Sequence, residues 1–248
     1  MSAIWLLSTR GRPEACQEVL DACEATGMTS PGLVYVDETV EEYADLRLPP
    51  NWTMHLEREW GSIAASMRYC LEKYPDASQY GWLADDNIPR TPGWDVALER
   101  AAGDWYISCA RDLWVSELGW HHPTGGPCFT SGLCWGGELI RTVGWWALPG
   151  VYQGGIDGAW NDLAGMLGLT RYLPHVIIEH RTWKLGKRAQ DETDEWVKQG
   201  MTYIATDLVH YNEWCKTGRK LVKTQVDSEL KRRRVSIQRR RSYRRSRV

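Results

Sequence analysis

The stretch YGWLADDNIPRTPGWD, residues 80–95, decides how this chain can fold. Its first five residues are apolar and predict a buried strand, which ends in the Asp-Asp-Asn triplet at 85–87. Thr91 and Pro92 then supply an N-cap and a first helical position, so we expect a helix that ends at Gly103. The acids therefore lie in a strand-to-helix crossover, at the edge of a sheet where ligands commonly bind.

The triplet suits a divalent cation. Asp85 and Asp86 offer hard carboxylate oxygens, which Mg²⁺ and Mn²⁺ prefer while they bridge to the phosphates of a substrate. Asp and Asn are also ordinary turn residues, so the triplet taken alone is more often a polar turn than a metal site. The rest of the chain has to decide between these two interpretations.

Composition indicates a globular protein with one sizeable α/β domain. The chain has 248 residues, of which 43% are hydrophobic and 25% are charged. It contains no apolar run of about 18 residues, and its first seven residues are too short for a signal sequence. We therefore expect no membrane insertion and a cytoplasmic location. Its seven cysteines form no C-x-x-C pair, which argues against a disulfide framework and a zinc ribbon.

The chain reads as alternating strands and helices. An apolar strand at 4–8, an amphipathic helix at 13–27 and a second strand at 33–36 form a βαβ unit, which implies a parallel sheet. Further on, the sequence predicts helices at 61–74, 138–144 and 156–167, and strands at 105–109, 128–135 and 172–178. Two irregular segments separate them, and four of their tryptophans are the favoured ligand contacts: Trp114, Trp120, Trp145 and Trp146.

Four segments in this order resemble a known family, the nucleotide-sugar glycosyltransferases of the GT-A fold, family-2-like and of the small bacteriophage type. The segments are WLLSTRGRPE (5–14), WLADDNIPRTPGWD (82–95), FTSGLCWGGELIRTVGWW (129–146) and GGIDGAWNDLAGMLGLTRYLPHVIIEH (154–180). The resemblance implies an α/β fold with a Rossmann-like, mostly parallel sheet flanked by helices. It also implies a metal-dependent enzyme, in which Mn²⁺ or Mg²⁺ assists a nucleoside-diphosphate sugar, with a UDP-sugar favoured.

The resemblance also assigns roles to individual residues. The residues it implies for donor binding are Thr9, Arg10, Arg12, Asp37, Asp85 and Asp86. Those it implies for the metal are Asp86, Asn87 and His180. Asp157 falls at the position of a general base, with Asp162 as its rival, because Gly158 and Ala159 follow Asp157. Asn87 stands where Asp is commoner in the family, which bears on metal affinity.

The chemistry fits these residues independently of the family. A divalent ion held by Asp86 and His180 can act as a Lewis acid on a diphosphate leaving group. A carboxylate such as Asp157 can take the proton of an acceptor hydroxyl, and this favours an inverting hexosyl or pentosyl transfer. The structural alternative for Asp157 is a helix N-cap.

Charge divides the chain unevenly. Residues 216–248 contain fourteen Lys or Arg against Asp227 and Glu229, a net charge of +12, so residues 1–215 carry −14. We predict a glycosyltransferase domain at 1–185, a helical extension at 186–230 with helices at 191–200, 202–216 and 221–230, and an unstructured basic tail at 231–248. The predicted contacts of the tail with nucleic acid are Arg232, Arg233, Arg234, Arg239, Arg240 and Arg241.

The basic tail indicates a polyanionic partner, because each neutralised phosphate releases counterions. DNA is the expected acceptor, with a hydroxymethylated pyrimidine of phage DNA as the favoured hydroxyl and the host cytoplasm as the location. Attachment to a membrane surface competes as a use of the tail, but Trp and Leu anchors are missing from it. Two alternatives for the whole chain stay open: transfer to a protein or a cell-envelope glycan, and a non-enzymatic nucleic-acid-binding protein.

Overall fold

The computed structural model describes residues 2–37, 40–58, 61–113, 132–181, 186–191 and 201–245, with the backbone alone for 40, 201–203 and 234–245. Trp114 and Trp120 lie outside these ranges, as do most of the predicted helix at 191–200 and the first part of the strand predicted at 128–135.

Within the described ranges, eight strands form one sheet in the order β3-β2-β1-β4-β7-β6-β8-β5. They are β1 (Ile4–Thr9), β2 (Gly32–Asp37), β3 (Trp52–Glu57), β4 (Gln79–Ala84), β5 (Asn87–Pro89), β6 (Ile107–Asp112), β7 (Leu133–Gly136) and β8 (Thr170–His180). β1 pairs in parallel with β2 and β4, and β2 pairs in parallel with β3. β7 and β5 run antiparallel to their neighbours, whereas β6 and β8 are parallel. The four strands β3, β2, β1 and β4 thus end at one edge of a mixed sheet.

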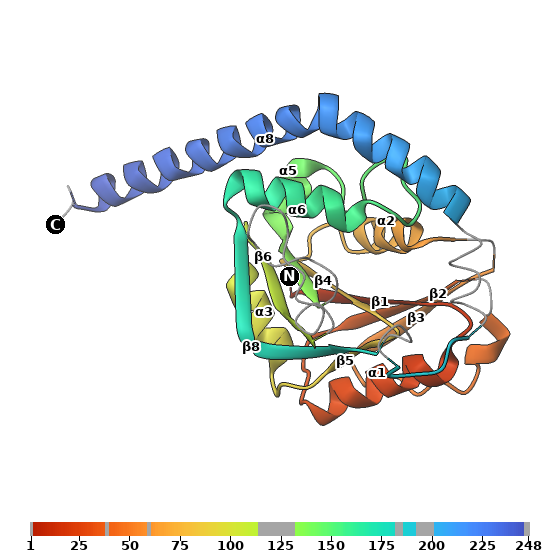
Figure 1. Ribbon diagram of the computed structural model, residues 1–248. Coiled ribbons are helices and arrows are strands. Elements are labelled where there is room, and N and C mark those ends of the chain that lie inside the picture. The colour runs from red at the N-terminus through yellow and green to blue at the C-terminus, as the bar shows by residue number, and fades with distance from the viewer. Residues whose placement is uncertain are drawn as a thin grey trace.

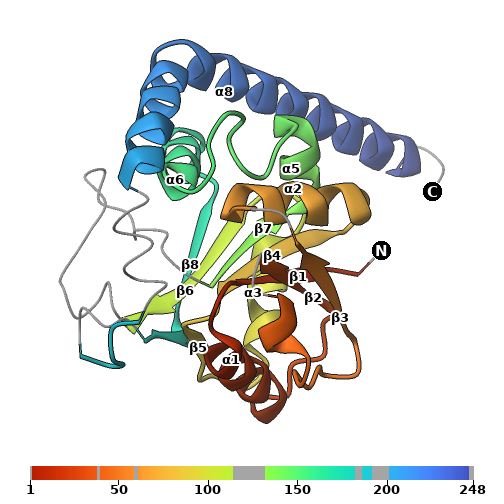
Figure 2. The same ribbon diagram turned by 90° about the vertical axis from the view of Figure 1, so that its right-hand side faces the viewer.

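Helices cover both faces of this sheet (Figure 1). The helices are α1 (Pro13–Ala25), the 3-10 helix η1 (Val40–Tyr43), α2 (Ile63–Lys73), α3 (Trp94–Ala102), α5 (Gly137–Val143), α6 (Ile156–Leu167) and α8 (Met201–Arg245). α1 and α3 lie on one face, and α2, α5 and α6 lie on the other with α8 outside them (Figures 1 and 2). The result is a three-layer α/β/α arrangement, and the predicted α/β fold class is confirmed.

α8 is one long helix, where the sequence predicted two helices and an unstructured tail from residue 231. Its middle part packs on α5 and α6, with Val226 fully buried in the core and Trp214, Val222 and Leu230 partly buried beside it. The rest continues past the body to Arg245 (Figure 1). Helix growth costs little once a docked segment supplies the nucleus, and Arg, Lys and Gln are good helix formers. The high charge density of the tail therefore did not indicate its backbone conformation, which is helical to Arg245.

Two strands and one helix start differ from the predictions. β3 and β5 were not predicted, and α3 begins at Trp94 with Gly93 as its N-cap, not at Pro92 after Thr91. The Thr91 hydroxyl instead accepts a hydrogen bond from the Ile177 amide at 2.8 Å and so binds β8.

Trp146, which the sequence favoured as a ligand contact, is a core residue. It is 1% exposed and packs against Tyr80 and Trp135, so it does not reach the surface.

No described helix combines the length and the apolarity that a membrane crossing requires.

The contact between β4 and the Trp5 ring supports a stability prediction. A Cβ atom at Gly81 would lie 2.2 Å from this ring. Trp5 is fully buried, donates from Nε1 to Glu99 at 2.8 Å and meets Trp94 edge-on at 4.4 Å, so its ring has no room to move. We expect Gly81→Ala to lower the free energy of unfolding by about 3 kcal/mol, as overpacked cores do.

Urea denaturation of the wild type and Gly81→Ala measures this effect. Gly93→Ala is the matched control, because a Cβ there meets nothing within 4 Å and the substitution costs only the strain of its positive φ of 65°. That strain is about 1 kcal/mol. An equal decrease in the free energy of unfolding of the two variants would show that the Trp5 ring can shift to accommodate the added Cβ atom.

Candidate active site

Three polar residues meet where the parallel strands end. Thr9 closes β1, Asp37 closes β2 and Asp85 follows β4. The register aligns these ends, since Thr9 pairs with Val36 and Ser8 pairs with Ala84. The chain passes from β1 to β2 on one side and then from β3 across to β4 on the other side, so the strand order reverses at β1, which is where ligand crevices form in such sheets.

Asp85 is held by hydrogen bonds from within the protein. Its Oδ2 accepts from the Thr9 hydroxyl at 2.9 Å, and its Oδ1 accepts from Arg12 Nη1 at 3.3 Å. Thr9 is in turn hydrogen-bonded to the Tyr43 hydroxyl at 2.7 Å. Burial raises the pKa of the Asp85 carboxyl above its usual value, although the Arg12 guanidinium beside it opposes that rise. Asp85 thus fixes Arg12 and the end of β1 in relation to each other.

Asp86 faces His180, and the pairing of β5 with β8 brings them together. Asn87 is directly opposite His180 in this pairing, and Asp86 Oδ2 lies 3.1 Å from His180 Nε2. The Asn87 amide donates to Asp86 Oδ1 at 3.0 Å, while its carbonyl oxygen accepts from the Ala84 amide at 3.1 Å. Asn87 was predicted as a metal ligand, but its carbonyl oxygen is already bound to the Ala84 amide. Its side-chain amide instead orients Asp86.

Asp112 is a site residue that the sequence analysis missed. It ends β6, is 6% exposed, and its Oδ2 lies 3.5 Å from His180 Nδ1. Burial lowers the pKa of His180, but the neighbouring carboxylates of Asp112 and Asp86 outweigh it and raise this pKa to about 9. A carboxylate on one ring nitrogen is the usual support of a metal-binding histidine, because it directs the other nitrogen at the metal. The available signal was a carboxylate just beyond the strand predicted at 105–109.

The Asp86–His180 pair fits a divalent cation that a substrate helps to bind. Two adjacent ligands at roughly 2.1 Å from an octahedral ion lie about 3 Å apart, and the oxygen and nitrogen here are separated by 3.1 Å. In the described ranges, no group of three or more His, Cys, Asp or Glu side chains is arranged to hold a metal. Two protein ligands are what Mg²⁺ commonly takes when phosphates supply others.

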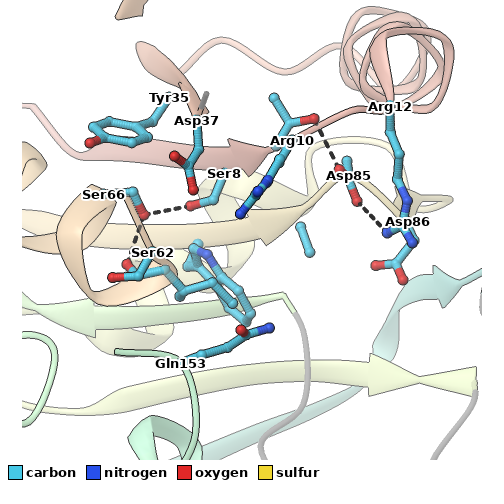
Figure 3. A pocket seen from close by; sticks show the side chains of 14 residues that line it. Ser8, Arg10, Arg12, Tyr35, Asp37, Ser62, Ser66, Asp85, Asp86 and Gln153 are labelled. Atoms are coloured by element: carbon cyan, nitrogen blue, oxygen red, sulfur yellow. Dashed lines mark hydrogen bonds and ion pairs between the residues drawn. The ribbon is translucent and has the colours of Figure 1, made fainter. Parts of the chain in front are cut away.

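A pocket of about 160 Å³ opens beside this pair (Figure 3). All six predicted donor-binding residues line it: Thr9, Arg10, Arg12, Asp37, Asp85 and Asp86. Asp37 is fixed by the Gly61 amide, which donates to its Oδ1 at 2.7 Å. Ser8, Ser62 and Ser66 add hydroxyl groups to the wall, and Gln153 lies across the pocket from Asp37. Residues from five separate segments of the chain therefore converge on one pocket.

A second cavity, of about 390 Å³, lies on the other side of Arg12 and the acid pair. Arg181, Lys187 and Arg188 contribute to its lining. Asp191 binds Arg12 there through two hydrogen bonds, from Nε at 2.8 Å and from Nη2 at 2.9 Å. Arg12 is thus shared between the two cavities, and its guanidinium offers the fork geometry that suits carboxylates and phosphates.

The two candidate bases are in different surroundings. Asp157 lies in the first turn of α6, where Gly155 is the N-cap, so Asp157 is not the cap. Its side chain keeps contact with solvent and accepts from the Gly158 amide at 2.8 Å. Partial desolvation by the surrounding protein raises the pKa of its carboxyl. Asp157 is not among the residues that line the 160 Å³ pocket as the described part of the chain forms it.

Asp162 binds α6 to α8. Its Oδ2 accepts from the Tyr211 hydroxyl at 3.0 Å and from Arg219 Nη1 at 2.9 Å. This carboxylate is committed to the packing of two helices, so it is the weaker candidate for a base.

The predicted tail residues divide into two groups. Arg232 and Arg233 both bind Glu229, and Arg233 also binds Glu138 of α5 and lies 5.0 Å from the centre of the Trp105 ring. The other four, Arg234, Arg239, Arg240 and Arg241, belong to the part of α8 described as backbone. The described side-chain contacts of α8 with the body therefore extend as far as Arg233.

Comparison with known proteins identifies the fold. No protein-family model matches the sequence, and no curated protein is similar to it. Among solved structures, glucosyl-3-phosphoglycerate synthase from Mycobacterium tuberculosis, in complex with Mn²⁺, UDP and glucosyl-3-phosphoglycerate, is similar with a TM-score of 0.59 and 12% identity. The similarity covers 85% of this chain and 80% of that one. The same synthase with Mg²⁺ and UDP has a TM-score of 0.59 and 14% identity.

TarS of S. aureus is similar with a TM-score of 0.51 and 11% identity, over 72% of this chain and 36% of TarS. The fold of this protein is therefore that of the GT-A glycosyltransferases. At these identities the likeness establishes the fold alone.

Proposed function

We propose that this protein is a metal-dependent glycosyltransferase, which moves a sugar from a nucleoside diphosphate to a hydroxyl acceptor. One observation carries the proposal: the six polar residues Thr9, Arg10, Arg12, Asp37, Asp85 and Asp86 line a single pocket, at whose edge Asp86 meets His180. Neither a polar turn nor a non-enzymatic nucleic-acid-binding protein would require cations, carboxylates and a histidine to converge in this way.

The donor would lie along the ends of β1, β2 and β4. Asp37 is suited to the base or ribose. Arg10 and Arg12 would place positive charge beside the diphosphate, and Asp85 and Asp191 hold the Arg12 guanidinium in that position. A UDP-sugar is the favoured donor, because structures of similar fold contain UDP with Mn²⁺ or Mg²⁺.

Asp86 and His180 would hold the cation, which supplies positive charge to stabilise the departing diphosphate. Asp112 keeps the His180 ring oriented for this purpose, and Asn87 does the same for Asp86.

Asp157 is the proposed general base. It would accept the proton of the acceptor hydroxyl while that oxygen bonds to the anomeric carbon and the diphosphate leaves with the electron pair of the broken bond. This single displacement inverts the anomeric configuration. We expect Asp157→Asn to lower the rate of transfer about 100-fold or more and to leave UDP affinity unchanged.

The pH profile gives a second test of Asp157. A base works when deprotonated, and desolvation raises the pKa of this carboxyl, so transfer should fall on acidification at a pH above the usual carboxyl value of about 4. That acidic limb should be missing in Asp157→Asn. A product that retains the anomeric configuration of the donor, measured by NMR, would reject this role.

The proposed acceptor is DNA, with the hydroxyl of a hydroxymethylated pyrimidine as the favoured group. The +12 charge of residues 216–248 against −14 for the rest of the chain supports a polyanion, and Arg suits phosphate well. Transfer to a protein or an envelope glycan would leave this charge unexplained.

The experiment that tests the function offers the purified protein a panel of labelled nucleoside-diphosphate sugars with Mn²⁺. Hydroxymethylated DNA, unmodified DNA and a pool of envelope glycans serve as acceptors. We expect label in hydroxymethylated DNA, and a loss of labelling when the metal is chelated. Label in glycan or protein alone would reject the DNA acceptor and keep the transferase. DNA binding with no turnover of any donor would instead favour the non-enzymatic alternative.

A further inference from the structure

α8 contributes a buried carboxylate to the loop that faces the pocket. Asp207, near the start of this helix, is 0% exposed. Its Oδ1 accepts from the Tyr152 amide at 2.9 Å, and its Oδ2 accepts from the amides of Gln153 at 2.8 Å and Gly154 at 2.7 Å. Three consecutive backbone donors thus share one acceptor group. Hydrogen bonds to an ionised acceptor are stronger than neutral ones, and buried donors left without a partner are costly.

The loop is also fixed on its other sides. The carbonyl oxygen of Tyr152 accepts from the Ala64 amide at 3.0 Å, which ties the loop to the first turn of α2. Gly150 and Gly155 have positive φ angles of 86° and 78°, and Cβ atoms there would lie 3.1 Å from the His210 ring and 3.2 Å from the Tyr211 Cβ. The backbone of residues 150–155 is therefore held between α2 and α8.

The loop at residues 150–155 connects Asp207 to the pocket. Gln153 lines the pocket opposite Asp37, and the loop leads directly into α6, whose first turn bears Asp157. The loop forms no strand or helix of its own between α5 and α6. Its position in relation to the ends of β1 and β4 depends on the Asp207 carboxylate, fifty-odd residues further along the chain.

We infer that Asp207 is a positioning residue for the transfer reaction. It holds Gln153 against the acceptor side of the pocket and sets the entry of α6, so the N-terminal part of α8 belongs to the working site. The inference rests on the proposed function, and it assigns Gln153 to the sugar or acceptor rather than to the nucleotide, which Asp37 and the arginines flank from the opposite side.

The test compares Asp207→Asn, Gln153→Ala and the double variant, with Glu213→Gln on the exposed side of α8 as the control. Asparagine keeps the size of the side chain but turns one acceptor into a donor that faces amide donors. We expect Asp207→Asn and Gln153→Ala each to lower kcat for transfer about 30-fold. UDP affinity with Mn²⁺, measured by calorimetry, should stay within twofold, and Glu213→Gln should behave as wild type.

Non-additivity separates positioning from a general loss of structure. If Asp207 acts through Gln153, the double variant should be no slower than Asp207→Asn, whereas independent losses would multiply to about 1,000-fold. Multiplied losses, or a wild-type kcat in Asp207→Asn, overturn the inference while the transferase stands. A wild-type protein that neither binds nor turns over a donor refutes the proposed function itself. If Asp207→Asn fails to fold, Gln153→Ala alone tests the inference. A wild-type kcat in Gln153→Ala would also overturn it.

Discussion

Asp86→Ala is expected to reduce sugar transfer by about 1,000-fold or more and to leave the fold intact. Among the residues that the structure describes, Asp86 provides the carboxylate that borders both the pocket and the Nε2 atom of His180. Without it, the cation would lose one of its two proposed protein ligands. Stabilisation of charge that develops on a leaving group is commonly worth 100-fold to 1,000-fold for one preorganised donor, and a metal ion supplies more.

Steady-state rates with labelled donor measure this effect, and thermal unfolding verifies the fold. Asp86 is partly exposed at the end of a turn and not part of the core, so we expect a Tm within a few degrees of the wild type. Asp45→Ala, at an exposed turn position, is the matched control for loss of a carboxylate. Asp86→Ala activity above a tenth of wild type would exclude Asp86 as a metal ligand.

Removal of the chain beyond Arg233 is expected to weaken duplex DNA binding at least 100-fold near 0.1 M salt. The truncation removes seven arginines and keeps every side-chain contact of α8 described above. Each phosphate contact contributes a slope of about 0.9 to the dependence of log K on log salt. Relative to 1 M salt, four contacts therefore contribute about three and a half powers of ten to the binding constant at 0.1 M, and this contribution is lost with them.

Binding titrations at several salt concentrations, with the full chain and the variant that ends at Arg233, give both affinity and slope. The charge-matched control replaces Arg239, Arg240 and Arg241 with lysine, and a second variant replaces them with glutamine. Lysine should retain the slope and glutamine should lower it. Equal slopes for the full chain and the truncated chain would show that residues 234–248 do not bind DNA.

The distance of residues 234–245 from the pocket also sets a length requirement for the acceptor. About 33 residues separate Asp207, above the pocket loop, from Arg240, which is about 50 Å of helix at 1.5 Å per residue. The C-terminal end of α8 lies on the opposite side of the body from the carboxyl end of β1 (Figure 1). Because α8 bends over the body, 50 Å is an upper limit, and a duplex of at most about 15 base pairs would reach from residues 234–245 to the pocket. Much shorter duplexes should gain nothing from these residues in labelling assays.

The donor side of the site follows from local sequence signals. β1, β2 and β4 are apolar runs that end abruptly in polar residues, and the carboxyl ends of parallel strands meet at one edge. Thr9, Asp37 and Asp85 could thus be predicted to lie close together before their contacts were known. The helices α1 and α2 were equally visible, because their buried residues repeat with helical spacing.

The missed features have weak or distant signals. β3 is an edge strand with one buried residue, Trp52, and β5 has three residues, so neither shows a hydrophobic pattern. Asp112 supports His180 only because β6 and β8 pair across more than sixty residues. Asp207 reads as an ordinary helical acid, and its three amide partners are 53 to 55 residues away. Contacts of this kind depend on tertiary packing, which spacing in a single sequence does not encode.

Calorimetric titration of UDP into the full-length protein, with and without Mn²⁺, tests the central claim most directly. It asks whether the pocket that contains Asp37, Arg10 and Arg12 and the Asp86–His180 pair act as one site. We expect micromolar binding of UDP with Mn²⁺ present, at least tenfold weaker binding with EDTA, and no effect of Mn²⁺ on UDP affinity in Asp86→Ala. Absence of binding by UDP and by every other nucleoside diphosphate, with Mn²⁺ or Mg²⁺ present, would contradict it.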